Sequence, residues 1–233
     1  MQIKPGDFSS GNYRYRSTPP GSLPTDEDIY ITISRGIRGT GMLPWFGLSS
    51  EERWAVTYYL KTLSDRFGRE GSGTPIVVPE APADRTSLVE RGRDLFGEAG
   101  CLECHGRHGK GDGPMVDGLR DGNGLPIKLR SFASDPFKRG STIRDIYISI
   151  ATGLDGTLMA PYGDSMPDED ILAVSAYVNS IVLQYTRKEG GMMELVPITH
   201  DEHAGIMMTY PAIPVGMMRY GIINLRAEPV LVN

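Results

Sequence analysis

The stretch Cys101-Leu102-Glu103-Cys104-His105 decides the fold, because it places both cysteines of the chain directly before a histidine. Two thiols at this spacing can each add to one vinyl group of a haem, and the adjacent imidazole can bind the iron. A redox-active CxxC pair is one alternative, but it has no need of the histidine. A zinc site is another, but it needs a second Cys/His pair that His108, His200 and His203 do not supply. The motif therefore predicts covalent haem attachment.

The segments around the motif follow a regular order of short helices and loops. Residues 86–96 place apolar or small side chains on one helical face, where Gly92 would let another helix approach closely. Residues 106–114, Gly-Arg-His-Gly-Lys-Gly-Asp-Gly-Pro, have neither a helical nor a strand period and predict a loop. A methionine-containing segment lies at 145–161, and the pattern predicts an amphipathic helix over residues 167–181.

This order of motifs resembles the class I cytochrome c family over roughly residues 85 to 185. The resemblance implies a mainly α fold and a covalently bound haem c. In that family the first and last helices cross near the haem, a contact that Gly92, Phe96 and Tyr177 would form here. The carbonyl of Pro114, the proline after the motif, would accept a hydrogen bond from the ring of His105 and fix its tautomer.

The second axial ligand of the iron has to be chosen among eleven methionines. Met159 lies in a loop with Gly153, Gly156 and Pro161, where a thioether could cross the face of the haem. Met166 directly precedes a predicted helix start, where an apolar residue is more simply explained as a hydrophobic staple. We therefore expect Met159 to bind the iron.

An internal repeat supports the choice of Met159. Residues 28–44 align without a gap with residues 145–161, and Met42 aligns with Met159. With one residue inserted, residues 51–59 also align with residues 169–177. Met166 has no counterpart. The chain thus contains one complete domain and a partial second copy.

The partial copy lacks a CxxCH segment. Ile3-Lys4 and Phe8 correspond to Ile127-Lys128 and Phe132, which follow the motif in the complete copy. Two explanations stay open. Either the intact protein contains a second haem with Met42 as an axial ligand, its motif lying in missing sequence or in another segment, or the N-terminal copy has lost its haem and serves as a scaffold.

Composition and the positions of proline and glycine predict four regions: a partial copy at 1–68, an extended Pro/Gly-rich linker at 69–83, a haem domain at 84–187 and a Met/Pro-rich arm at 188–233. Trp45 and Trp54 of the partial copy are expected in its core. The arm has no helical period, because its prolines divide it into short pieces.

The function that follows from these features is single-electron transfer, not substrate turnover, since an iron with two protein ligands has no open position. The formal net charge of −5 argues against nucleic acid as a partner. No apolar run approaches the ~20 residues needed to span a bilayer. The resemblance implies a periplasmic or otherwise extracytoplasmic protein, because haem is attached outside the cytoplasm in bacteria.

The arm, with its three pairs of methionines, favours docking onto redox protein partners in a larger respiratory or oxidoreductase complex. An arm that wraps its own domain is the alternative. A freely diffusing carrier and a dihaem peroxidase-like enzyme are the other functions that the sequence leaves open.

Overall fold

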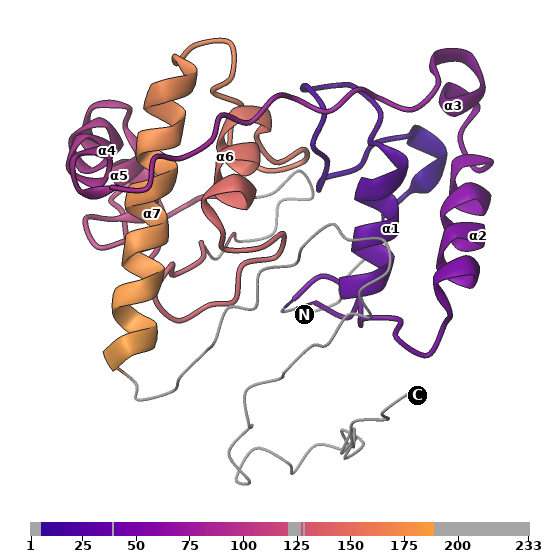
Figure 1. Cartoon of the computed structure of the whole chain (residues 1–233), viewed down its shortest axis with the longest axis horizontal. Helices are drawn as coiled ribbons and strands as arrows, with labels where there is room; N and C mark the ends of the chain where they lie inside the picture. The colour runs from indigo at the N-terminus through magenta and orange to yellow at the C-terminus, as the bar shows by residue number, and fades with distance from the viewer. Residues whose placement is uncertain (1–5, 39, 121–126, 128, 189–233) are drawn as a thin grey trace, which may run out of the picture. The chain divides into compact units, whose positions relative to one another are not determined.

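The computed structural model describes residues 6–38, 40–120, 127 and 129–188, with side chains up to residue 182, and these residues form helices and loops without a β-strand. In chain order the elements are η1 (Phe8–Ser10), α1 (Asp26–Arg35), α2 (Ser50–Lys61), α3 (Asp65–Glu70), α4 (Thr86–Glu98), α5 (Cys101–His105), α6 (Ile143–Thr152) and α7 (Asp168–Lys188) (Figure 1). The predicted mainly α fold is confirmed. The predicted arm lies, beyond Lys188, outside the described residues.

Residues 1–185 form one compact unit. No described helix is both long and apolar enough to cross a membrane.

Helices α4 and α7 cross at Gly92, and the crossing leaves no room for a side chain there. A Cβ atom built on Gly92 would overlap the backbone carbonyl of Ala173 in α7. One turn further along α4, the buried ring of Phe96 packs edge-on against Tyr177, with ring centroids 5.5 Å apart. The predicted contact of these three residues is therefore present, and α6 packs against it through Ile146 and Ile150.

Helix α1 and the loop after it repeat α6 and its loop in hydrogen-bonding detail. Each helix begins at a threonine, Thr25 or Thr142, whose hydroxyl accepts a bond from the amide three residues later. Each helix is followed by a glycine with positive φ, 62° at Gly36 and 65° at Gly153. The two aligned segments therefore share the threonine before the helix and the glycine after it.

The inner cores of the two copies also correspond. In the complete copy the shared positions are Ile146, Ile150, Val174 and Val178, and in the N-terminal copy they are Ile29, Ile33, Val56 and Leu60. Each set joins the helix before the methionine loop to the helix after it.

A segment without a helix, residues 71–82, connects α3 to α4 and is here called the strap (Figure 1). The amide of Gly73 donates to the carbonyl of Pro24, and the amide of Ile76 donates to that of Ser17 (2.8 Å). The side chains of Ile76, Val78 and Ala81 pack against the core that α4, α6 and α7 share. The strap thus contacts both copies.

The expectation that Trp45 and Trp54 lie in the core is wrong. Trp45 is 52% exposed, and Trp54 is half-buried in a stack between Tyr30 and Tyr58, with centroids 4.4 and 5.9 Å away. Trp54 therefore packs between Tyr30 of α1 and Tyr58 of its own helix, outside the buried cluster of Leu23, Ile29, Ile33 and Phe67.

Candidate functional site

The CxxCH stretch forms the short helix α5, which follows α4 after a turn at Gly100. This glycine has a φ of 73°, a left-handed conformation that glycine adopts without strain. Cys101 and Cys104 are both half-buried. Cys101 packs against the same buried cluster as Phe96. The turn therefore places the motif at the edge of the helical core.

Burial makes the thiol of Cys101 a poor nucleophile. Loss of hydration raises the pKa of Cys101 to about 11. A redox-active CxxC pair needs a thiol that ionises readily, so its pKa is usually lowered. The environment of Cys101 argues against thiol–disulfide exchange as its role.

The imidazole of His105 lies among apolar side chains, which favour its neutral form. Its ring stacks on Phe132, with centroids 4.7 Å apart, and lies 6.3 Å from the ring of Phe96. Burial lowers the pKa of His105 to about 4. The Nδ1 atom is buried and has no hydrogen-bond partner among the described residues. A neutral imidazole with an unpaired buried nitrogen suits a metal ligand.

The expected hydrogen bond from the His105 ring to Pro114 is not formed. Backbone bonds from Gly113 to Cys104 (3.2 Å) and from Met115 to Glu103 (2.9 Å) hold the proline beside α5. The ring of His105 instead follows the plane of Phe132, on which it stacks. Pro114 is thus near the motif, but it does not orient the imidazole here.

The glycine-rich loop after α5 can lie close to the motif because its glycines lack side chains. A Cβ atom on Gly113 would overlap the carbonyl of Glu103, and one on Gly109 would press into the ring of Phe132. Gly106, Gly109 and Gly111 all have positive φ. The loop therefore folds back over α5 and holds Phe132 against the histidine.

The loop after α6 brings Met159 to the same core. The amide of Leu154 donates to the carbonyl of Met159 (3.1 Å), and the amide of Met159 donates to the hydroxyl of Thr157 (3.1 Å). The side chain of Met159 is half-buried against the cluster that also contacts Cys101. Met166 is half-buried against this cluster as well, so burial alone does not decide between the two methionines.

The loop at Met42 closes in the same way. The amide of Ile37 donates to the carbonyl of Met42 (2.9 Å), and the amide of Met42 donates to the hydroxyl of Thr40 (3.1 Å). The surroundings differ, since the neighbouring Leu43 and Phe46 are exposed, at 69% and 45%. Within the described residues the N-terminal copy has no counterpart of α4 and α5.

Other candidate ligands are not brought to the site. His108 is exposed, while His200 and His203 lie outside the described residues. No group of three or more His, Cys, Asp or Glu side chains in the described part of the chain could hold a metal ion. The zinc alternative therefore gains no support there.

Two features of the site have no clear signature in the sequence. In the sequence, Phe132 is used only to align the two copies. Its stacking on His105 depends on the fold of the glycine-rich loop. Asp155, in the Met159 loop, forms an ion pair with Arg16 of the N-terminal copy (2.8 Å). Residues so far apart in the chain are joined only by the packing of the two copies.

Comparison with known proteins agrees with this arrangement. The cytochrome c family profile matches residues 89–181. A chain of the reducing HAO-like protein complex from Kuenenia stuttgartiensis is 37% identical, with 78% of this chain and 83% of that chain covered and a TM-score of 0.71. Cytochrome CL from the marine methylotrophic bacterium Methylophaga aminisulfidivorans is 16% identical, with 50% and 85% of the chains covered and a TM-score of 0.33, too low to bear on fold or function. No curated protein matches the chain.

The family match lies over α4, α5, α6 and α7, the elements that surround the CxxCH motif and Met159. The similarity to the chain of the HAO-like complex covers most of both proteins. This chain therefore belongs to the cytochrome c family.

Proposed function

We propose that Cys101 and Cys104 would attach a haem through two thioether bonds and that His105 and Met159 would be the protein ligands of its iron. Family membership implies a covalently bound haem c. Cys101 and Met159, from two separate elements, pack against one buried cluster. Met159, unlike Met166, also has a counterpart in Met42, whose loop closes with matching hydrogen bonds. A haem held there supplies a centre that gains and loses one electron at a time.

The protein's own groups suit this role. Burial keeps the His105 imidazole neutral and therefore able to donate a lone pair. Phe96 and Phe132 exclude water from one side of the histidine ring. A thioether as the second ligand raises the reduction potential and leaves no open iron position. These features support an electron-transfer protein that is not itself an enzyme.

The test of the ligand assignment is the far-red absorption band of ferric haem that has a methionine ligand. Met159→Ala should abolish this band, and Met166→Ala, the matched control in the same region, should keep it. The opposite pattern would assign the ligand to Met166. Free thiols at Cys101 and Cys104 with no haem absorption would remove the proposal altogether.

The alternative of a dihaem peroxidase-like enzyme predicts a different response. Such an enzyme needs one five-coordinate iron, so the resting protein should bind cyanide readily and reduce peroxide. A six-coordinate carrier should bind cyanide only slowly, because the methionine must leave first. Measuring both rates on the native protein separates the two functions.

We propose further that the protein works as a subunit of a larger extracytoplasmic complex. The 37% identical chain of Kuenenia stuttgartiensis belongs to a protein complex, and the match covers 83% of that chain. Exposed Trp45, Tyr58 and Tyr59 would suit a partner surface. Native mass spectrometry of the protein from its source should give a mass above one chain with its haem. One chain alone would support a freely diffusing carrier.

We also propose an extracytoplasmic location for the protein. Haem c attachment supports this location, because the chemistry takes place outside the bacterial cytoplasm. Cell fractionation should recover the haem-bearing chain with periplasmic or surface markers. Recovery of the haem-bearing chain with cytoplasmic enzymes would contradict the proposal.

A second haem near Met42 has a specific observation in its favour. The Met42 and Met159 loops close with matching hydrogen bonds, so the N-terminal copy keeps the shape that presents an axial methionine. The intact mass of the native protein counts its haems directly. If there are two, Met42→Ala should change the spectrum of one of them. A single haem that is unaffected by Met42→Ala would favour the scaffold explanation.

A further inference from the structure

Two arginines of the N-terminal copy bind the loop that carries Met159. The Arg16 guanidinium donates to both carboxylate oxygens of Asp155, from Nη2 at 2.8 Å and from Nε at 3.2 Å. Arg14 donates from Nε to the backbone carbonyl of Asp155 at 2.9 Å. Three bonds thus reach one residue, four positions before Met159 in the sequence.

Arg16 is a fixed anchor. It is 2% exposed, and its Nη1 atom donates to the carbonyl of Thr18 (2.6 Å), which is itself fully buried. A buried guanidinium has to keep its partners, because leaving its charge unpaired is costly. The two parallel bonds of the guanidinium fix the orientation of the Asp155 carboxylate as well as its distance from Arg16. The position of the Asp155 carboxylate is therefore dictated from the N-terminal copy.

Asp155 lies inside the turn that presents Met159. The amide of Leu154 bonds to the Met159 carbonyl, and the amide of Thr157 bonds to the Leu154 carbonyl, both at 3.1 Å, so Asp155 moves with this turn. We propose that Arg16 is a positioning residue that clamps the Met159 loop and keeps the thioether on the iron. This inference rests on the proposed function, in which Met159 is the axial ligand.

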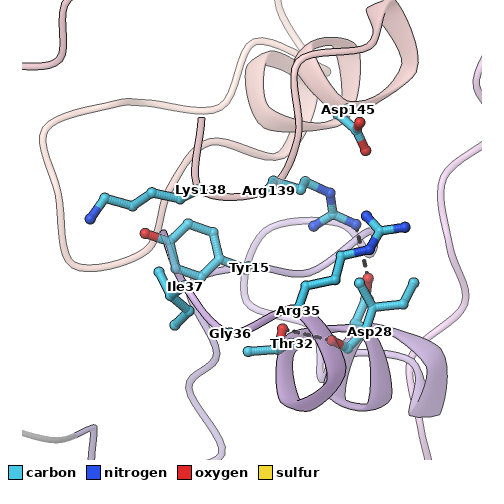
Figure 2. A pocket seen from close by; sticks show the side chains of 10 residues that line it. Tyr15, Asp28, Thr32, Arg35, Gly36, Ile37, Lys138, Arg139 and Asp145 are labelled. Atoms are coloured by element: carbon cyan, nitrogen blue, oxygen red, sulfur yellow. Dashed lines mark hydrogen bonds and ion pairs between the residues drawn. The ribbon is translucent and has the colours of Figure 1, made fainter. Parts of the chain in front are cut away.

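The equivalent ion pair is not available to the Met42 loop of the N-terminal copy. The position equivalent to Asp155 is Arg38, whose side chain cannot accept a hydrogen bond from a guanidinium. The ion pair that runs the other way joins Arg139, before α6, to Asp28 of α1 at 2.9 Å (Figure 2). This second pair contacts a helix, not a methionine loop. It therefore provides a control that weakens the contact between the copies without removing a bond to the Met159 loop.

The test is the rate at which cyanide binds the ferric, haem-bearing full-length protein, because cyanide enters only when the methionine leaves. Arg16→Gln should increase this rate by about tenfold or more, since it removes a charge-assisted, bidentate interaction. It should also weaken the methionine absorption band and lower the reduction potential. Arg139→Gln should leave the cyanide rate within about twofold of the native value.

Equal acceleration in Arg16→Gln and Arg139→Gln would overturn the clamp, because the effect would then come from a general loosening of the two copies. Unchanged cyanide binding in Arg16→Gln would also overturn it. If that variant does not fold, Asp155→Asn removes the same pair from its more exposed side and should give a similar acceleration. Where both variants fold, the double variant should be no faster than Arg16→Gln.

Different results would refute the clamp and the assignment of Met159 as the ligand. A methionine band that survives Met159→Ala would refute the ligand assignment itself. A band lost in Met159→Ala, together with native cyanide rates in Arg16→Gln, would refute only the clamp.

Discussion

Helices α2 and α7 have related sequences and occupy equivalent positions in their copies, but the outer face of α7 is buried and that of α2 is exposed. On the inner face, Thr57 and Ser175 are both fully buried. On the outer face, Ala173 is 0% exposed under Gly92 of α4, while the equivalent Ala55 is exposed. The inner face packs within its own copy, whereas the outer face depends on a helix that the described part of the N-terminal copy does not contain.

The largest expected difference concerns these two alanines. Ala173→Leu should lower the free energy of unfolding by about 3 kcal/mol, because the added atoms have no space beneath α4. Ala55→Leu should change it by less than about 0.5 kcal/mol, since leucine is a good helix former on an open surface. Denaturant unfolding of the haem-bearing protein measures both. A large cost for Ala55→Leu would mean that something covers this face of α2.

The tyrosines one turn later should show a smaller difference in the same direction. Tyr177→Ala should cost about 2 kcal/mol, because it removes the aromatic contact with Phe96. Tyr59 is 63% exposed, so Tyr59→Ala should be nearly neutral. The same unfolding experiment applies. Equal costs would show that the comparison between the outer faces is mistaken.

The N-caps of α1 and α6 should respond alike, because in both the threonine hydroxyl accepts the backbone amide of an aspartate, Asp28 or Asp145. Thr25→Ala and Thr142→Ala each remove a hydroxyl that accepts a backbone amide bond. Each should cost about 1 kcal/mol. Hydrogen exchange of the first-turn amides, compared with that in the parent protein, localises the effect. A cap whose loss leaves exchange unchanged would indicate that its helix start is held by other contacts.

The smallest expected effect concerns the threonines of the two methionine loops. Thr157→Val and Thr40→Val each remove a hydroxyl that donates to a loop carbonyl at 2.7 Å and accepts from a methionine amide at 3.1 Å. Each change should cost about 0.5 to 1 kcal/mol. Thr157→Val should also weaken the methionine absorption band slightly. A weakened band in Thr40→Val alone would place the working axial ligand in the N-terminal loop.

The parts of the structure that sequence could predict are those set by local pattern. The CxxCH motif, the helix that contains Gly92 and the register of the repeat all follow from residues close together in the chain. The exposed Trp45 could not be predicted, because an indole favours a core wherever one is available. The pair between Arg16 and Asp155 is also absent from any local pattern, since it depends on how the two copies pack.

The ring of His105 illustrates a further limit. Its expected bond to Pro114 rests on a single proline after the motif, and the structure keeps that proline beside α5. The orientation of the imidazole is instead determined by Phe132, which the glycine loop brings to the histidine. A motif identifies the groups that meet, but the loop geometry decides which of them bond.

The strap limits how the protein can be dissected. Ile76, Val78 and Ala81 lie upstream of α4, but they pack against the core of the complete copy. A truncated protein that starts at residue 84 would therefore expose the apolar surface that these three side chains cover. The shortest fragment that keeps this surface covered has to begin at or before Ile76, even though the family match starts only at residue 89.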